Sequence, residues 1–259
     1  MSKGGIFSLD GASVLIVGAG GILGRRSALV AGRLGATISV ADHESASAGL
    51  EETLVILRSE GIEADALICD VTSESSVEQC IAATVARRGL DVLINTAGVM
   101  LRKPVTETSL EEWQRVLDVN LTGTWLLNRA AGRVMMPKGC GKVINFASVY
   151  AERVGPVPES AYYASKSGIA NLTRSMASEF GTYGVHVNCL ALGVFFPTNM
   201  TAPLKDAPET LQWMVERTLL KRLGDPERDL DGIVALLASK ASDYITGQVL
   251  YVDGGWSAW

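Results

Sequence analysis

The chain has 259 residues, of which 47% are hydrophobic and 20% are charged, and its formal net charge is −5 at pH 7. This composition predicts a soluble globular protein and excludes an intrinsically disordered chain. The negative charge and the lack of any basic run exclude a nucleic-acid-binding surface, so we expect a small-molecule partner.

Short β-branched runs alternate with helical stretches along the whole chain. Each run is predicted to be a buried parallel strand. The alternation predicts an α/β fold: a single-domain, doubly wound Rossmann fold over residues 1–259, with a seven-stranded parallel sheet and helices on both faces. The predicted strands are 13–17, 37–41, 66–69, 91–95, 142–146, 186–190 and 249–252.

A glycine-rich loop, G-A-G-G-I-L-G, follows the first predicted strand and leads into a helix predicted over 25–34. Glycines permit positive φ and let backbone N–H groups approach a pyrophosphate at a helix N-terminus. A tight strand-to-helix turn without a ligand would give a similar pattern, but the strand and helix context favours a dinucleotide site. The loop residues expected to contact the cofactor are Gly18, Gly21, Ile22, Leu23 and Gly24.

Asp42 stands at the end of the second predicted strand. A carboxylate there can accept hydrogen bonds from the adenosine ribose hydroxyls and would repel a 2′-phosphate. Nothing obvious attracts that phosphate, although Arg25 and Arg26 are close in sequence. NAD is therefore favoured over NADP. An S-adenosylmethionine-dependent methyltransferase would show a similar loop and acid, so this half of the chain indicates a nucleotide and no reaction.

No segment predicts a membrane anchor or an export signal. The longest apolar run, 14–23, is too short to cross a bilayer, and residues 1–10 lack the apolar core of a signal peptide. We expect a cytoplasmic protein whose cysteines are reduced and pack as small core hydrophobes, without a bound metal. The four cysteines, which show no metal-ligand spacing, are Cys69, Cys80, Cys140 and Cys189.

The stretch S-A-Y-Y-A-S-K at 160–166 places two tyrosines ahead of a lysine near the start of a predicted helix. Tyr162 lies four residues before Lys166 and shares its helix face, whereas Tyr163 lies three before it. Core packing alone would also explain aromatics at helical spacing. The stretch by itself therefore leaves both interpretations open.

Several ordered motifs resemble those of the short-chain dehydrogenase/reductase family, in its subgroup of about 250-residue chains, and together they are far more specific than any one of them. The resemblance covers essentially the whole chain. The motifs are N-T-A-G at 95–98, L-D-V-N-L-T-G at 117–123, Y-A-S-K at 163–166, V-N-C-L-A-L-G at 187–193, K-R-L-G-D-P-E at 221–227 and Y-V-D-G-G-W at 251–256.

The resemblance implies a catalytic set of four residues. It implies that Tyr162 is the general acid/base and that Lys166 lowers its pKa and holds the ribose. It also implies that Ser148 orients the substrate oxygen and that Asn120 keeps a water in a proton relay. A free phenol has a pKa of about 10, so a base working near neutral pH needs a lower pKa, which Lys166 and the nicotinamide cation are expected to supply. The further cofactor residues implied are Asp70, Val71, Asn95, Ala97 and Gly98.

The sequence departs from the family pattern in three places. Val17 and Ile22 replace a threonine and a glycine of T-G-x-x-x-G-x-G, the loop 149–159 is one residue longer than the commonest spacing, and Leu192 replaces the proline of a P-G pair. We therefore expect a reshaped substrate side, with 192–224 as a substrate-side loop and lid and 192–208 irregular.

The resemblance implies an NAD-dependent oxidoreductase that moves a hydride between a secondary alcohol or ketone, or a sugar hemiacetal, and the nicotinamide. R-K-P at 102–104 and V-D-G-G-W at 252–256 are most similar to dehydrogenases of sugars, polyols and sugar acids, with 3-oxoacyl-[acyl-carrier-protein] reductases as the alternative. From another class, a non-catalytic nucleotide-sensing Rossmann protein would not need the four catalytic residues. A hydrolase using Ser148 is disfavoured, because no G-x-S-x-G surrounds it.

Arg102 and Arg153 are the candidate substrate-binding residues, because each follows a predicted strand at its carboxyl end. Arginine suits a carboxylate, so the expected substrate is a polar, anionic, hydroxylated molecule. Both could instead be solvated surface charges, with Arg153 pairing with Glu152.

The resemblance also implies a homotetramer, formed through long helices at about 109–135 and 160–182 and through the C-terminal segment. Trp256 and Trp259 near that end fit a subunit contact, because exposed aromatics often mark interfaces. Packing of the same tail against its own subunit is the alternative.

Overall fold

A seven-stranded, fully parallel sheet forms the centre of the computed structural model, which describes residues 4–258. The strand order is β3-β2-β1-β4-β5-β6-β7, so the winding reverses between β1 and β4 and the predicted doubly wound fold class is confirmed. β3 begins two residues earlier than predicted. The strands are β1 (Ser13–Val17), β2 (Thr37–Asp42), β3 (Ala64–Ile68), β4 (Val92–Asn95), β5 (Gly141–Phe146), β6 (Val185–Leu192) and β7 (Val249–Val252).

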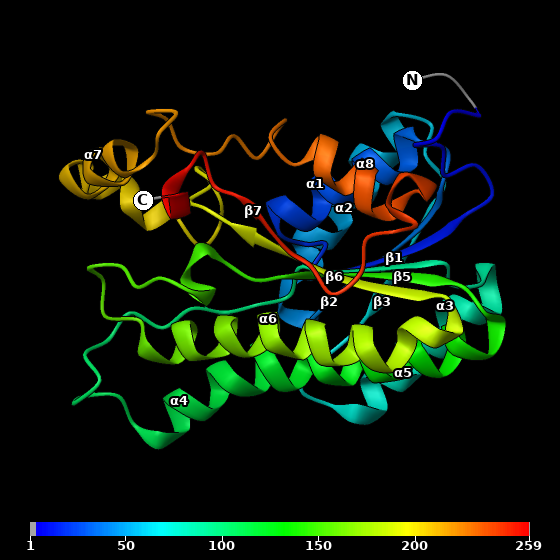
Figure 1. The fold of residues 1–259 in the computed structure, drawn as a ribbon, viewed down its shortest axis with the longest axis horizontal. Coiled ribbons are helices and arrows are strands. Elements are labelled where there is room, and N and C mark those ends of the chain that lie inside the picture. The colour runs from blue at the N-terminus through cyan, green and yellow to red at the C-terminus, as the bar shows by residue number, and fades with distance from the viewer. Residues whose placement is uncertain (1–3, 259) are drawn as a thin grey trace.

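Helices cover both faces of the sheet, with α1, α2 and α8 on one side and α3 to α6 on the other (Figure 1). α1 begins at Ile22, three residues earlier than predicted, and it therefore includes Gly24. The helix predicted over 109–135 is two helices joined by a π-helical stretch, Asp118–Thr122. The α-helices are α1 (Ile22–Arg33), α2 (Ser47–Ser59), α3 (Glu74–Arg88), α4 (Leu110–Leu117), α5 (Gly123–Lys138), α6 (Ser160–Phe180), α7 (Pro208–Arg217) and α8 (Asp231–Ala238).

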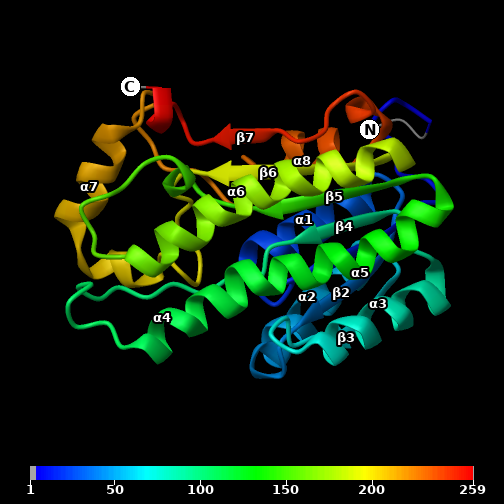
Figure 2. The same cartoon turned by 60° about the horizontal axis from the view of Figure 1, so that its bottom comes forward.

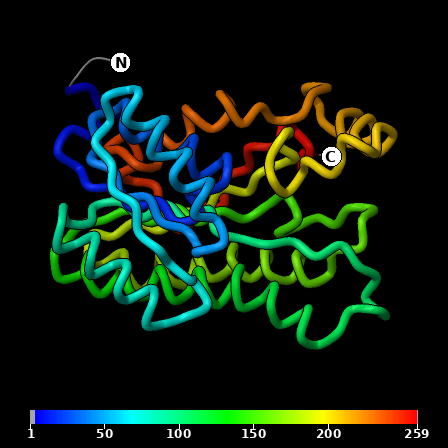
Figure 3. Tube along the Cα trace, turned by 180° about the vertical axis from the view of Figure 1, so that it is seen from behind, coloured from blue at the N-terminus to red at the C-terminus, as the bar shows by residue number. Residues whose placement is uncertain are grey.

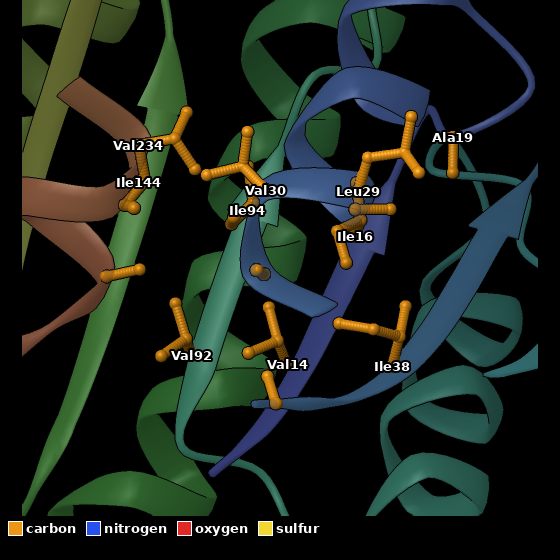
Figure 4. Close-up of a cluster of buried hydrophobic side chains, with 14 of the residues drawn as sticks. Val14, Ile16, Ala19, Leu29, Val30, Ile38, Val92, Ile94, Ile144 and Val234 are labelled. Carbon is orange, nitrogen blue, oxygen red and sulfur yellow. The ribbon is translucent and has the colours of Figure 1, made fainter. Parts of the chain in front are cut away.

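The strands supply two separate cores, because successive side chains of a strand point to opposite faces. Val14 and Ile16 pack with side chains of α1, α2 and α8, in the cluster that Figure 4 shows. Leu15 and Val17 pack on the other face with α3, α5 and α6. All of β1 is buried, which explains why its sequence is a continuous apolar run.

The strands end on the side where α7 and the C-terminal segment lie (Figure 2). The segment expected to be irregular over 192–208 contains a 3₁₀ turn, Ala202–Asp206, and α7 follows it directly, so that expectation was wrong in part. Seen from behind, α7 lies beside the C-terminal segment (Figure 3). These parts share a third apolar cluster at the carboxyl edge of the sheet.

The C-terminal tail packs against its own chain. Trp256 is 1% exposed, and its ring makes edge contacts with Tyr150 and Trp213, at centroid distances of 6.4 and 5.5 Å. The expectation that Trp256 lies in a subunit contact was therefore wrong, since the same chain already buries it. Trp259, the other half of that expectation, lies outside the described residues.

Cys69, Cys80 and Cys189 are buried free thiols, as the sequence predicts, but Cys140 is exposed, so the core expectation was wrong for it. Cys140 lies between α5 and β5, where the chain turns at the surface. Within residues 4–258, no helix has the length and apolarity to cross a membrane, and no group of three or more acidic, histidine and cysteine side chains could hold a metal ion.

Candidate active site

A cleft of about 1300 Å³ lies along the carboxyl ends of the central strands. This is the edge where ligands bind in doubly wound sheets. Of the site residues predicted from the sequence, Asn95, Asn120 and Arg153 do not line the cleft. The predicted site residues that do line it are Gly18, Gly21, Ile22, Leu23, Gly24, Asp42, Asp70, Val71, Ala97, Gly98, Arg102, Ser148, Tyr162 and Lys166.

The glycine loop is shaped by close packing of β1 and α1 against the turn after β4. Gly18 has φ +87°, and a Cβ there would lie 2.5 Å from Thr96 Oγ1 and 2.6 Å from the backbone nitrogen of Ala97. A Cβ at Gly24 would lie 2.4 Å from the carbonyl oxygen of Gly18. No side chain fits at either position, so the loop backbone is left bare toward the cleft at the start of α1.

Asp42 is fixed at the end of β2 by two backbone donors. Its Oδ2 accepts a hydrogen bond from Gly20 N at 2.8 Å, and its Oδ1 accepts one from His43 N at 2.7 Å. Burial raises the pKa of this carboxyl, and the two hydrogen bonds oppose that rise. Gly20, to which the sequence assigned no role, therefore holds Asp42 in place at the glycine-loop end of the cleft.

Arg25 and Arg26, the two cations nearest the glycine loop in sequence, are both engaged outside the cleft. Arg25 Nη2 lies 2.7 Å from Glu52 Oε2, and Arg26 Nη2 lies 2.6 Å from Asp231 Oδ2. Their side chains are 17% and 11% exposed. Neither guanidinium is placed to meet a phosphate in the cleft.

Asn95 and Asp70 stabilise the segments around the cleft through hydrogen bonds to nearby residues. Asn95 Nδ2 donates to Thr124 Oγ1 at 2.9 Å, and its Oδ1 accepts from Ala97 N at 3.1 Å, which fixes the turn that carries Ala97. Asp70 Oδ1 accepts from the hydroxyl and the backbone nitrogen of Thr72, and these bonds lower the pKa of its carboxyl. Asn95 is thus a brace behind the cleft rather than part of its surface.

Ser148, Tyr162 and Lys166 meet on one wall of the cleft. Ser148 is the second residue after the end of β5, whereas Tyr162 and Lys166 lie one turn apart on α6. The Ser148 hydroxyl, which accepts a hydrogen bond from Tyr150 N at 3.2 Å, lies close enough to the Tyr162 phenol to influence its pKa. Lys166 Nζ lies 5.4 Å from the centroid of the Tyr162 ring and donates to the backbone oxygen of Phe146 at 2.8 Å.

Burial controls the ionisation of this group. It raises the pKa of the Tyr162 phenol, an effect that the adjacent Ser148 hydroxyl opposes, and it lowers the pKa of the Lys166 ammonium to about 8. The expectation that Lys166 and the nicotinamide cation together lower the pKa of this phenol stays a prediction, because the shift described here is that of the protein without a nucleotide.

Tyr163 points to a different place from Tyr162. Its hydroxyl donates to Val157 O at 2.7 Å and accepts from Gly155 N at 3.3 Å, and its ring centroid lies 4.8 Å from that of Tyr150. Tyr163 thus ties down the lengthened loop after Ser148 and does not line the cleft. The tyrosine that shares its helix face with Lys166 is thus the one that lines the cleft, and its catalytic role stays a prediction.

Asn120 is fully buried in the π-helical stretch, and its side chain is held by protein atoms. Its Oδ1 accepts from Val99 N at 2.8 Å, and its Nδ2 donates to Val99 O at 2.9 Å and to Ser165 Oγ at 3.0 Å. Both amide hydrogens are used in this way, so the side chain clamps the chain after β4 against α6. Its place in a water relay stays a prediction. π-helical turns are frequent at functional sites, but the sequence does not reveal this one.

The other end of the cleft contains an ion pair between the exposed Arg102 and the buried Glu159, which the sequence did not indicate. Arg102 Nε donates to Glu159 Oε1 at 2.8 Å, and its two terminal nitrogens each lie 3.4 Å from Met200 O. Burial raises the pKa of Glu159, which Arg102 opposes. The sequence did contain one signal for Glu159. It is an acid three residues before Tyr162, and this spacing places the two side chains close together at the start of α6.

Arg153 lies outside the cleft, contrary to the sequence expectation. Its terminal nitrogens donate to the backbone oxygens of Glu152 and Ser257, at 3.3 and 3.2 Å. The lengthened loop turns this side chain toward the C-terminal segment. Glu152 pairs instead with Arg174, at 3.8 Å.

Comparisons with known proteins agree with this architecture. A family model described as "Enoyl-(Acyl carrier protein) reductase" matches residues 18–257. Gluconate 5-dehydrogenase of Gluconobacter oxydans (strain 621H) is 36% identical over 258 residues, covering 98% of both chains. The 2-dehydro-3-deoxy-D-gluconate 5-dehydrogenase of Bacillus subtilis (strain 168) is 35% identical over 250 residues, covering 96% of both.

A solved structure of a gluconate 5-dehydrogenase from Burkholderia cenocepacia J2315, in complex with NADP and tartrate, superposes with a TM-score of 0.91. That protein is 33% identical, and the match covers 98% of each chain. The chain described here is accordingly a Rossmann-fold oxidoreductase. It belongs to the short-chain dehydrogenase/reductase family, as the sequence motifs indicated.

Proposed function

We propose that the protein is an NAD-dependent dehydrogenase that interconverts a secondary alcohol and a ketone on a sugar acid or a related polyhydroxylated substrate. The observation that carries this proposal is the position of Ser148, Tyr162 and Lys166 on one wall of the cleft whose far end holds the glycine loop and Asp42. The named activities of the Gluconobacter and Bacillus relatives support the substrate class.

Each residue has a task that its position supports. When bound, the nicotinamide accepts or returns a hydride. Tyr162 takes the alcohol proton or returns it, and Ser148, which lines the same cleft beside this phenol, orients the substrate oxygen. Lys166, anchored on Phe146 O, holds the ribose and places a positive charge beside the Tyr162 ring, which favours the phenolate. Residues 192–224 act as the substrate-side loop and lid, since Met200 and Leu204 line the cleft.

A substrate panel tests this function. Sugars, polyols, sugar acids and 3-hydroxyacyl thioesters are offered with NAD, and NADH formation is followed by its absorbance. We expect the highest kcat/KM within the sugar acids. Turnover confined to 3-hydroxyacyl thioesters would instead identify a carrier-protein reductase, and nucleotide binding without any turnover would identify a nucleotide sensor.

We expect the enzyme to prefer NAD over NADP by tenfold or more in kcat/KM, which is about 1.4 kcal/mol. The reason is the charge of Asp42, which repels a 2′-phosphate while Arg25 and Arg26 are paired elsewhere. Steady-state kinetics with both nucleotides measure the preference. Asp42→Asn, which keeps the shape and removes the charge, should narrow it. The solved Burkholderia relative contains NADP, so equal use of the two nucleotides is the result that would count against Asp42.

Replacing Arg102 should weaken the binding of an anionic substrate, whereas replacing Arg153 should not. A charge-assisted hydrogen bond contributes about 1.5 to 3 kcal/mol, so Arg102→Ala should raise KM for the best sugar acid roughly ten- to a hundredfold. Arg153→Ala is the matched control, because its guanidinium contacts backbone oxygens outside the cleft. An unchanged KM in Arg102→Ala, or better turnover of neutral polyols than of every acid, would refute the anionic substrate.

The protein is further proposed to act as a homotetramer in the cytoplasm, with α4 to α6 at the subunit contacts. The support is an apolar hollow on α5 and α6, whose rim includes Trp125 and Tyr183, 40% and 50% exposed. Light scattering on the purified protein measures the oligomeric state, and a monomer at micromolar concentration would refute it.

A further inference from the structure

Glu159 is a carboxylate buried in the wall of the cleft, with only one of its oxygens engaged. Its side chain is 3% exposed, and its Oε1 accepts a hydrogen bond from Arg102 Nε. Among residues 4–258, no side chain or backbone group donates a hydrogen bond to Oε2. Burying a carboxylate is costly unless its lone pairs are satisfied. An acceptor oxygen is therefore available beside the cleft.

Tyr150 brings a second unused polar group to the same part of the cleft. It is 6% exposed and lines the cleft, and no described residue is hydrogen-bonded to its hydroxyl. Its ring is fixed between those of Tyr163 and Trp256. Burial and the nearby acid Glu159 raise the pKa of this phenol, so it stays protonated and can donate.

These groups together match a particular ligand chemistry. Arg102 offers two terminal nitrogens whose only hydrogen bonds within the described part of the chain, to Met200 O, are long at 3.4 Å. Glu159 accepts hydrogen and Tyr150 donates it. A carboxylate next to hydroxyl groups satisfies all three, whereas a hydrocarbon chain would leave the Glu159 charge and the Tyr150 hydroxyl without partners.

We propose that Glu159 is a specificity-determining residue that binds the substrate directly, by accepting a hydrogen bond from a hydroxyl other than the one that is oxidised. Arg102 holds the substrate carboxylate in the same subsite, and Tyr150 donates to a neighbouring oxygen. The subsite thus selects polyhydroxylated acids over acids that carry a single hydroxyl. This inference rests on the proposed dehydrogenase function.

If Glu159 acted only by positioning Arg102, a different result would be expected. In that case loss of the Glu159 charge would disturb every substrate that bears a carboxylate, whatever its hydroxyl groups. Direct binding affects only substrates with the additional hydroxyls. Two acids of equal length, D-gluconate and 5-hydroxyhexanoate, separate the cases, because both carry a carboxylate and a hydroxyl at carbon 5 and only gluconate carries the others.

The test compares Glu159→Gln with Arg102→Gln on these two acids. Glu159→Gln should lower kcat/KM for gluconate about ten- to a hundredfold, the loss expected for a hydrogen bond to a charged group, and leave the value for 5-hydroxyhexanoate nearly unchanged. Arg102→Gln should lower kcat/KM for both acids. Glu159→Asp, which keeps the charge and shortens the side chain, should lie between wild type and Glu159→Gln. NADH binding and thermal unfolding show whether Glu159→Gln folds. If it does not, Glu159→Asp takes its place in the comparison.

An equal loss on the two acids, or no loss on gluconate, overturns direct binding by Glu159 while leaving the proposed function intact. If the wild-type enzyme prefers another polyhydroxylated compound, the same comparison is made between that compound and its analogue without the extra hydroxyls. A wild-type enzyme that turns over no polyhydroxylated compound overturns both the proposed function and this inference.

Discussion

Tyr162→Phe is expected to lower kcat by roughly 10² to 10⁴, the range that general acid–base catalysis contributes. The change removes one oxygen from a side chain that is 6% exposed and touches both Ser148 and the cleft. The ring remains, so the packing of α6 and the nucleotide end of the cleft should be preserved. Stopped-flow measurement of NADH formation gives the rate, and fluorescence titration with NADH gives the nucleotide affinity.

Tyr163→Phe is the matched control. It removes the same oxygen from the next residue of the same helix, where the hydroxyl is bonded to Val157 O and Gly155 N. Loss of these bonds should cost about 1 kcal/mol of folding stability and leave most of the activity. Equal losses of kcat in the two variants would show that neither phenol is the acid/base, and loss of NADH binding in Tyr162→Phe would assign it a structural task.

Lys166→Met is expected to remove most of the activity and to change how stability depends on pH. Burial lowers the pKa of the Lys166 ammonium to about 8 in the folded chain, from its ordinary value of 10.5. Between these values the unfolded chain binds more protons at this site than the folded chain, so the free energy of unfolding rises with pH. From pH 7 to 9.5 the wild type should gain about 2 kcal/mol relative to Lys166→Met.

Urea unfolding of both proteins without nucleotide at several pH values measures this difference, since the other titrating groups are common to both chains and cancel. The absolute stability of Lys166→Met at one pH is less informative, because the change also leaves Phe146 O without its donor. A constant gap between the two unfolding curves would mean that Lys166 keeps its ordinary pKa in the fold.

The sheet could be predicted from the sequence because local chemistry determines it. Val14 to Val17 are apolar at every position, as a strand buried on both faces requires, and Gly18 and Gly24 of the next loop occupy positions where a Cβ would collide with Thr96. The position of Asp42 could be predicted as well. It is the last residue of β2, and the carboxyl ends of all strands in this fold lie at the same edge of the sheet.

The substrate end could not be predicted in the same way, because it depends on contacts between segments far apart in the chain. Arg102 and Glu159 are 57 residues apart, and no local pattern joins them. Arg153 looked equivalent to Arg102 by its position after a strand, but the lengthened loop carries it to Ser257. The π-helical turn at Asn120 likewise has no signature in the sequence.

The packing of Trp256 on Tyr150 and Trp213 has a consequence for the order in which the cleft is built. The glycine loop and Asp42 meet within one βαβ unit, so they are close together in the sequence. The Tyr150 end of the cleft is completed by Trp256, which follows them far along the chain. During synthesis the residues of the glycine-loop end are therefore made well before the last residue of the Tyr150 end, and a substitution of Trp256 should disturb the Tyr150 end without touching Asp42.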